Sequence, residues 1–581
     1  MSLLASLVLA APARAGDPIM PLSDVRAGMA CSALSVVRGL EPASFDVEIL
    51  DVVEGSGGVD GPRILIRVSG PAVDATGIGP GFSGSPIFCR DRQGRPANAG
   101  AISESIGEYG GKVVLATPIE TILGNPPDAP ARAKPRPQAT RRARKLAEPL
   151  TVSGLSRPLS TALSSAARKR GRTILAAPPG PLRSFPPQTL RPGSAVGVGY
   201  SSGDLTIGAV GTVAYVDGDR VWSFGHELDA AGRRSLLMQD AYVYRVINNP
   251  NQLGEIGSTY KLAAASHDIG TVSNDALSAV VGRLGGLPRT VPVRATARDQ
   301  DTGLRETVDA NVADETDAED PLGLSLVSLI GPLAVTQAAA GVLRSSPAKV
   351  TGDMCVNIGV RELKKPLRIC NRYVGDGGGG AGEGGEVTNV VAAGAGSDLE
   401  TALSLITTYT GQALHVTSVE AGLRVRRGAD LAYMRELRLP RRVRAGQRLR
   451  ARLTIQRLRG PKQVVRVPLR MPSGLSRGSH RIILRGAEAD LGDDSLFEEL
   501  VIDLDGEEER EDDRARDESA LDIGPQSLAE LREAIEEIER YDGVELFVDR
   551  ARGEGRRAYR DPQQRLAGRV SARVVVGKRR R

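Results

Sequence analysis

The chain has 581 residues, more than one hydrophobic core usually organises, so we expect three or four domains. Apolar residues make up 41% of it, whereas aromatic residues make up only 3%, and 68 glycines and 36 prolines favour turns and short strands. This composition predicts a mainly β protein. The net charge of +6 is small for the length, and the basic residues are spread along the chain, so nucleic acid is not an expected partner.

The first fifteen residues (1–15) are predicted to be a secretory signal peptide. Their apolar stretch ends in Ala13-Arg14-Ala15, an A-x-A cleavage pattern. No basic residue precedes the stretch, so a buried N-terminal strand is the alternative. We therefore expect a secreted or cell-envelope protein.

Four cysteines form an even set without C-x-x-C spacing, which in an exported chain favours two disulfides over a zinc site. The expected pairs are Cys31 with Cys89 and Cys355 with Cys370. No histidine pair has metal-ligand spacing either, so we expect neither a metal nor another cofactor.

Residues 18–124 and 151–300 are predicted to form two β units. In both, short β-branched runs alternate with glycine-rich turns, and Asp217-Gly218 is typical of a hairpin turn. Residues 125–150 between them are basic and rich in proline, a composition that predicts a semi-extended linker.

The remainder is predicted to hold accessory domains. Residues 301–420 form a mixed helical and β region with a glycine-rich tract, 421–505 a β-sandwich-like domain, 506–526 an acidic linker, and 527–581 a helix followed by strands. Ser527 and Glu530 have the spacing of a capping box, and Gly543 suits the C-terminal cap of that helix. The uncharged segment 322–343 could span a membrane, but Pro332 and several polar residues favour a buried helix, so membrane association is not expected.

The motif Gly81-Phe82-Ser83-Gly84-Ser85-Pro86 is the strongest functional signal. Its serine lies in a glycine-walled turn between two strand-like segments, where a side chain projects outward, as a nucleophile requires. The amides of Gly81 and Ser83 could hold an oxyanion if Gly81 takes a backbone conformation denied to larger residues. A structural β-turn is the alternative for this motif taken alone.

His226 follows a predicted strand in Gly225-His226 and is the expected base for Ser83, because serine needs an imidazole to accept its proton at neutral pH. The other three histidines, His267, His415 and His480, lie in contexts that suggest structural or exposed roles.

These two segments resemble the SpoIVB family of serine peptidases, known from sporulation signalling. One matching block runs from Phe45-Asp46-Val47-Glu48-Ile49 through Thr76-Gly77-Ile78 and the Ser83 motif to Ala116-Thr117-Pro118-Ile119, and the other joins residues 208–215 to Trp222-Ser223-Phe224-Gly225-His226. The resemblance implies a trypsin-like double β-barrel, here split by the linker, with Ser83 as nucleophile and His226 as catalytic histidine.

The sequence departs from the family in three respects. The serine half precedes the histidine half, so the two halves are circularly exchanged, which catalysis tolerates because the side chains need to meet only in space. The family's acid aligns with Ser69 or Gly70, neither of which is acidic, so Asp74, Asp229 and Asp240 are the candidates for the third triad member. A Ser–His dyad, or a polar partner such as Ser69, is the alternative. No PDZ domain is recognisable.

The leading hypothesis is therefore an exported serine endopeptidase that cleaves a protein or peptide substrate through an acyl-enzyme. The alternative is a catalytically inactive peptidase-like scaffold that binds a cell-envelope partner. A structural β-repeat or adhesion protein would explain the glycine and strand content but not the pairing of the serine and histidine motifs.

Overall fold

The computed structural model describes most of the chain. The described residues are 16–54, 61–106, 110–129, 144–145, 149–169, 173–181, 184–248, 259–316, 325–343, 349–375, 390–457, 460–486, 524–538, 543–549, 556–561 and 563–577. The predicted signal peptide, most of the basic linker, the glycine-rich tract and most of the acidic linker lie outside them. The chain forms two compact units, one of residues 1–155, 163–290 and 310–326, and the other of 156–162, 291–309 and 327–581.

The first unit begins with a closed six-stranded antiparallel barrel. Its strand order is β4-β1-β2-β3-β6-β5, and pairing of β5 with β4 closes the ring. Alternation explains the strands, since Phe45, Val47 and Ile49 of β2 face the core while the residues between them face outward. The elements are β1 (Ala30–Ser35), β2 (Ala43–Val53), β3 (Arg63–Ser69), β4 (Pro86–Arg90), β5 (Pro96–Ser105), β6 (Val113–Pro118), β7 (Arg144–Lys145), η1 (Leu22–Asp24) and α1 (Ile119–Leu123).

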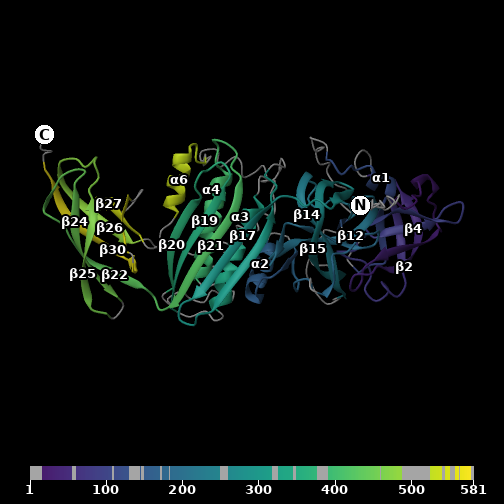
Figure 1. Cartoon of the computed structure of the whole chain (residues 1–581), viewed down its shortest axis with the longest axis horizontal. Helices are drawn as coiled ribbons and strands as arrows, with labels where there is room; N and C mark the ends of the chain where they lie inside the picture. The colour runs from purple at the N-terminus through teal and green to yellow at the C-terminus, as the bar shows by residue number, and fades with distance from the viewer. Residues whose placement is uncertain are drawn as a thin grey trace, which may run out of the picture. The chain divides into compact units, whose positions relative to one another are not determined.

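A second closed six-stranded antiparallel barrel follows in this unit. Figure 1 labels its strands β12, β14 and β15. The order is β10-β14-β15-β16-β13-β12, and β12 pairs back to β10. Register shifts interrupt the pairing of its two longest strands, β14 and β15, as is usual where barrel strands bend. The elements are β8 (Leu150–Ser153), β9 (Ile174–Ala176), β10 (Ala195–Gly199), β11 (Ser201–Gly203), β12 (Thr206–Asp217), β13 (Arg220–Ser223), β14 (Gly232–Asn248), β15 (Thr259–Ala276), β16 (Ala279–Leu284) and α2 (Arg157–Lys169).

The double barrel predicted from the sequence is thus confirmed. The second barrel, however, ends near residue 290 instead of 300, because β17 leaves it and pairs in parallel with β21 in the second unit.

The second unit contains a sheet of order β18-β17-β21-β19-β20 with helices against one face. Val391 of α4 packs on Gly352 of β19, and Gly331 of α3 lies against Leu399 and Leu403 of α4. The elements are β17 (Thr290–Asp299), β18 (Arg305–Ala313), β19 (Val350–Val360), β20 (Leu367–Gly375), β21 (Val416–Arg427), α3 (Leu326–Leu343) and α4 (Val390–Thr407). A disulfide joins Cys355 to Cys370.

Helix α3 is long and apolar enough to cross a membrane by length and composition, and 72% of its apolar window is buried in the structure. This burial also fits the core helix of a globular domain.

The second unit also contains two sheets that enclose a common core, with orders β25-β24-β22-β29 and β23-β30-β26-β27-β28. The predicted sandwich boundaries of 421–505 need correction, because β21 belongs to the helix-covered sheet and strands after residue 543 complete the sandwich. Gly543 begins β27 instead of capping the helix. The elements are β22 (Leu431–Arg438), β23 (Arg442–Val443), β24 (Arg448–Arg457), β25 (Lys462–Arg470), β26 (Gly478–Gly486), β27 (Gly543–Val548), β28 (Arg556–Arg560), β29 (Arg565–Ala567), β30 (Arg569–Val576) and α6 (Leu528–Glu537).

Candidate functional site

Ser83 lies in the loop between β3 and β4 of the first barrel. The loop turns through Gly81 and Gly84, whose backbone φ angles of +94° and +87° fall in the left-handed region that favours glycine. A Cβ at Gly84 would collide with the carbonyl oxygen of Thr212 and with the amide nitrogen of Phe224. The Ser83 carbonyl accepts a hydrogen bond from the Thr212 amide at 2.8 Å. The loop is therefore packed tightly against the second barrel.

His226 comes from the second barrel, three residues after β13 ends. The Phe224 amide, two residues earlier, donates to the Thr212 carbonyl at 3.2 Å. Thr117 of the first barrel donates through Oγ1, at 2.7 Å, to the carbonyl of the residue before His226. Thr212 therefore bonds both to the Ser83 loop and to the segment that carries His226, so the fold brings the two predicted motifs together at the junction of the barrels.

The His226 ring is held by a main-chain acceptor. Its Nδ1 lies 2.5 Å from the carbonyl oxygen of Glu227, and the residue is only 4% exposed. A carbonyl oxygen can only accept, so Nδ1 carries the proton of this hydrogen bond. In the neutral imidazole Nε2 is then the acceptor, the form in which a histidine can take a proton from a serine.

The Ser83 hydroxyl is fully buried, with 0% exposure, and Oγ has no hydrogen-bond partner among the described residues. No hydrogen bond therefore joins Ser83 Oγ to His226 in this structure. A general base needs to approach its hydroxyl to about 2.6–3.2 Å, although this bond is often longer before substrate binds. The two segments are adjacent, but the nucleophile–base bond is not formed.

Two of the three candidate acids, Asp74 and Asp240, are each hydrogen-bonded to a basic side chain other than His226. Asp74 binds Lys112 Nζ at 2.7 Å, and this hydrogen bond lowers the pKa of the exposed Asp74 carboxyl. Asp240 is buried and binds His267 Nδ1 at 3.0 Å. Both carboxylates thus have basic partners other than His226.

The third candidate, Asp229, belongs to a buried network. It accepts hydrogen bonds from the Tyr200 hydroxyl at 2.9 Å and from Arg234 at 3.1 Å. Arg234 also forms a bidentate pair with Glu315, at 2.8 and 2.9 Å. This network ties Asp229 to the body of the barrel.

A carboxylate that the sequence analysis missed fixes the turn after His226. Asp275 of β15 accepts hydrogen bonds from the amides of Leu228 and Asp229, both at 2.7 Å, and of Ala231 at 3.2 Å. Burial, together with the charge of Asp229, raises the pKa of Asp275 to about 6. Asp275 is thus a positioning residue for the segment that carries His226.

Lys261 of β15 was also missed. Its buried Nζ donates to Ser35 Oγ at 2.7 Å and to Thr212 Oγ1 at 3.1 Å, and it lies 4.6 Å from the ring centroid of Phe82. Ser85 Oγ in turn donates to Ser35 Oγ at 2.9 Å. A lysine is rarely buried, and the sequence signal for it was only a single charge at the start of the otherwise apolar segment Leu262-Ala263-Ala264-Ala265. Lys261 links both barrels to the Ser83 loop.

The other histidines have acidic partners. His415 Nδ1 lies 2.6 Å from Glu362, and His480 Nδ1 lies 2.8 Å from Asp549. Within the part of the chain that the structure describes, no group of three or more His, Cys, Asp or Glu residues could hold a metal ion. The first barrel also contains the disulfide between Cys31 of β1 and Cys89 of β4.

Comparisons with protein-family models, curated proteins and solved structures find no match for this chain. The class of site is therefore defined by its own geometry. It consists of a glycine-walled serine loop from one closed β-barrel and an oriented histidine from a second, brought together by one shared threonine.

Proposed function

We propose that this chain is an exported serine endopeptidase of the SpoIVB type, which cleaves a protein substrate through an acyl-enzyme. The observation that carries the proposal is the convergence of the Ser83 loop and the His226 segment on Thr212. This convergence makes the exchanged order of the two halves compatible with a shared site, since a catalytic pair depends on position in space.

In the proposed mechanism, Ser83 Oγ attacks the substrate carbonyl while His226 Nε2 accepts the serine proton. The amides of Gly81 and Ser83 stabilise the oxyanion of the tetrahedral intermediate. His226 then gives its proton to the leaving amine, and water, activated by the same histidine, releases the acyl group. The Glu227 carbonyl keeps the imidazole in the required tautomer.

Substrate access requires a local opening, because Ser83 is 0% and His226 4% exposed. Such an opening would have to move the Ser83 loop away from its packing partners and bring Oγ within hydrogen-bonding distance of His226. Export is supported by the two disulfides, which persist in oxidising compartments.

The alternative function is an inactive peptidase-like scaffold that binds a cell-envelope partner. Two observations favour it: the burial of both residues and the absence of a hydrogen bond to Ser83 Oγ from any described residue. The experiment below separates the two functions.

The test is labelling of the purified full chain by a fluorophosphonate probe, with the modified residue located by mass spectrometry. We expect labelling of the wild type at Ser83 and its loss in Ser83→Ala and His226→Ala. Labelling should be retained in the control Ser105→Ala, a buried serine of β5 whose Oγ also has no hydrogen-bond partner among the described residues. Because Ser83 Oγ has no described hydrogen-bond partner, Ser83→Ala should not lower the Tm. Absence of labelling in the wild type, or equal labelling of Ser83→Ala, would favour the scaffold.

A further inference from the structure

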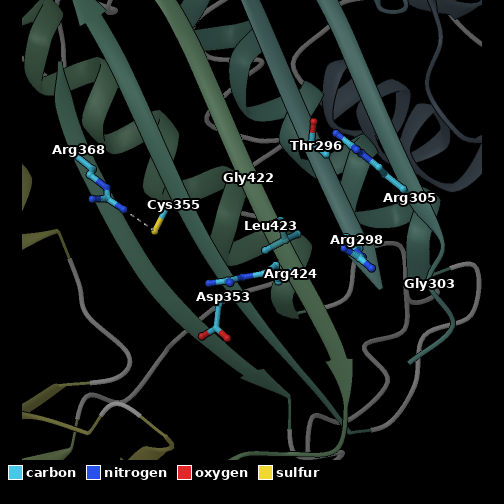
Figure 2. Close-up of a pocket in the computed structure, with 10 residues that line it drawn as sticks. All are labelled: Thr296, Arg298, Gly303, Arg305, Asp353, Cys355, Arg368, Gly422, Leu423 and Arg424. Carbon is cyan, nitrogen blue, oxygen red and sulfur yellow. Dashed lines mark hydrogen bonds between the residues drawn. The ribbon is translucent and has the colours of Figure 1, made fainter. Parts of the chain in front are cut away.

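One face of the sheet in the second unit carries a cavity of about 550 Å³ (Figure 2). This volume falls within the usual range of small-molecule sites, about 300–1,000 Å³. Four arginines line it, together with a single acidic residue, Asp353. They are Arg298, Arg305, Arg368 and Arg424.

The strand register explains why this face is hollow. Gly422 of β21 lies opposite Thr296 of β17 and opposite Cys355 of β19, so a row of small residues crosses the sheet. A Cβ at Gly422 would meet only the Cys355 carbonyl, at 4.0 Å. Small residues therefore form the floor, and the longer side chains beside them form the walls.

The next outward-facing row holds Arg298 of β17, Arg424 of β21 and, on the other side of Arg424, Asp353 of β19. Arg298 and Arg424 are direct neighbours on the paired strands β17 and β21. Like charges opposite each other in a sheet are destabilising. Among the residues that the structure describes, the side chains of Arg298, Arg305 and Arg424 form no hydrogen bond or ion pair. These three guanidinium groups border the cavity without a carboxylate partner.

The one acid in the lining does not balance them. Asp353 is already paired with Arg372 and Arg426, each at 2.6 Å, outside the lining set. Burial alone would raise the pKa of Asp353, but these two hydrogen bonds lower it, so its charge is satisfied within its own cluster. The cavity therefore keeps a net positive charge.

We propose that this cavity binds a small ligand that carries at least two negative charges, as phosphate or carboxylate groups. Planar guanidinium groups match the oxygens of both anions, and a multivalent anion would relieve the repulsion between Arg298 and Arg424. Phosphate and carboxylate share this chemistry, so the test distinguishes them. The inference does not depend on the proposed peptidase activity.

The experiment is calorimetric titration of the full chain with inorganic pyrophosphate and, separately, with citrate, at low and at physiological ionic strength. We expect saturable binding of at least one of the two, and the tighter one identifies the anionic group. Arg424→Gln should weaken that binding at least about tenfold, because hydrogen bonds to charged groups are lost.

Arg294→Gln is the matched control. Arg294 lies on β17 as Arg298 does, but it is paired with Asp309 at 2.6 Å and does not line the cavity. Its substitution should change binding by less than about twofold. Without ligand, the Tm of Arg424→Gln should stay close to that of the wild type. The Arg424 side chain forms no ion pair, and it lies between the like charge of Arg298 and the opposite charge of Asp353.

Three results would overturn the proposal. The first is the absence of saturable binding of both anions to the wild type. The second is an equal loss of binding in Arg424→Gln and Arg294→Gln, which would indicate unspecific attraction to a basic surface. The third is a lower Tm of ligand-free Arg424→Gln, which would make the arginine a structural residue.

Discussion

Gly84 offers a direct test of how the Ser83 loop is packed. In Gly84→Ala the new Cβ would collide with backbone atoms of Thr212 and Phe224, and the residue would keep a φ of +87°. The left-handed backbone costs an alanine roughly 1–2 kcal/mol. The collision, which flexible side chains cannot relieve, adds roughly 1–3 kcal/mol. We expect the free energy of unfolding of the barrel unit to fall by about 2–5 kcal/mol. Scanning calorimetry would record this as a fall in Tm of roughly 5–15 °C.

Gly94→Ala is the control for the backbone contribution alone. Gly94 has a comparable φ of +76°, but a Cβ there would meet no atom within 4 Å. We expect Gly94→Ala to lower the free energy of unfolding only by the roughly 1–2 kcal/mol that the left-handed conformation costs. If both variants lost the same stability, the Ser83 loop would not be packed on the second barrel. Thr212 would then not hold the Ser83 loop and the His226 segment together.

Two further predictions concern stability. The pKa of Asp275 is raised to about 6 from an ordinary 3.8, so the folded state binds this proton more tightly than the unfolded state does. Protonated Asp275 therefore adds up to about 3 kcal/mol to the free energy of unfolding. This contribution is complete below pH 3.8 and is lost as the pH rises through about 6. Asp275→Asn should remove this decline, and an unchanged dependence of Tm on pH would contradict the assignment. The Cys31–Cys89 disulfide spans 58 residues and Cys355–Cys370 spans 15, so their removal as Cys→Ser pairs should cost about 4 and about 3 kcal/mol. Denaturant unfolding that gave the reverse order would refute this chain-entropy estimate.

The β strands of the two barrels were predictable because their signal is local, whereas the double barrel itself was expected from the family resemblance. Strands such as β2 alternate buried Phe45 and Val47 with outward polar residues, and turns such as Asp217-Gly218 mark the hairpins between them. Most barrel strands pair with a strand close to them in the chain, whereas β1 with β4 and β3 with β6 in the first barrel, and β10 with β14 and β13 with β16 in the second, join more distant segments. Local alternation and turn chemistry were therefore sufficient to predict the fold class.

The sandwich boundaries were not predictable, because they depend on pairing between distant segments. β26 pairs with β27 and β30, although residues 487–523 separate it from both, and β22 pairs in parallel with β29. Alternation shows that each segment is a strand but not which partner it takes. Likewise, β21 has the alternating pattern expected of a sandwich strand, yet it pairs with β17 and β19.

The sequence could not reveal which group orients His226, and the reason is chemical. A search for a third triad member looks for Asp or Glu, whereas the acceptor here is the main-chain carbonyl of Glu227, which any residue type supplies. This carbonyl fixes the tautomer and the ring, but it carries no formal charge, so it should stabilise the imidazolium formed during acylation less than a carboxylate would. Under the proposed peptidase activity, slow acylation of Ser83 is therefore expected. The probe test must follow labelling to completion in wild type and Ser83→Ala alike, because a slow but Ser83-dependent reaction supports the peptidase and only its absence supports the scaffold.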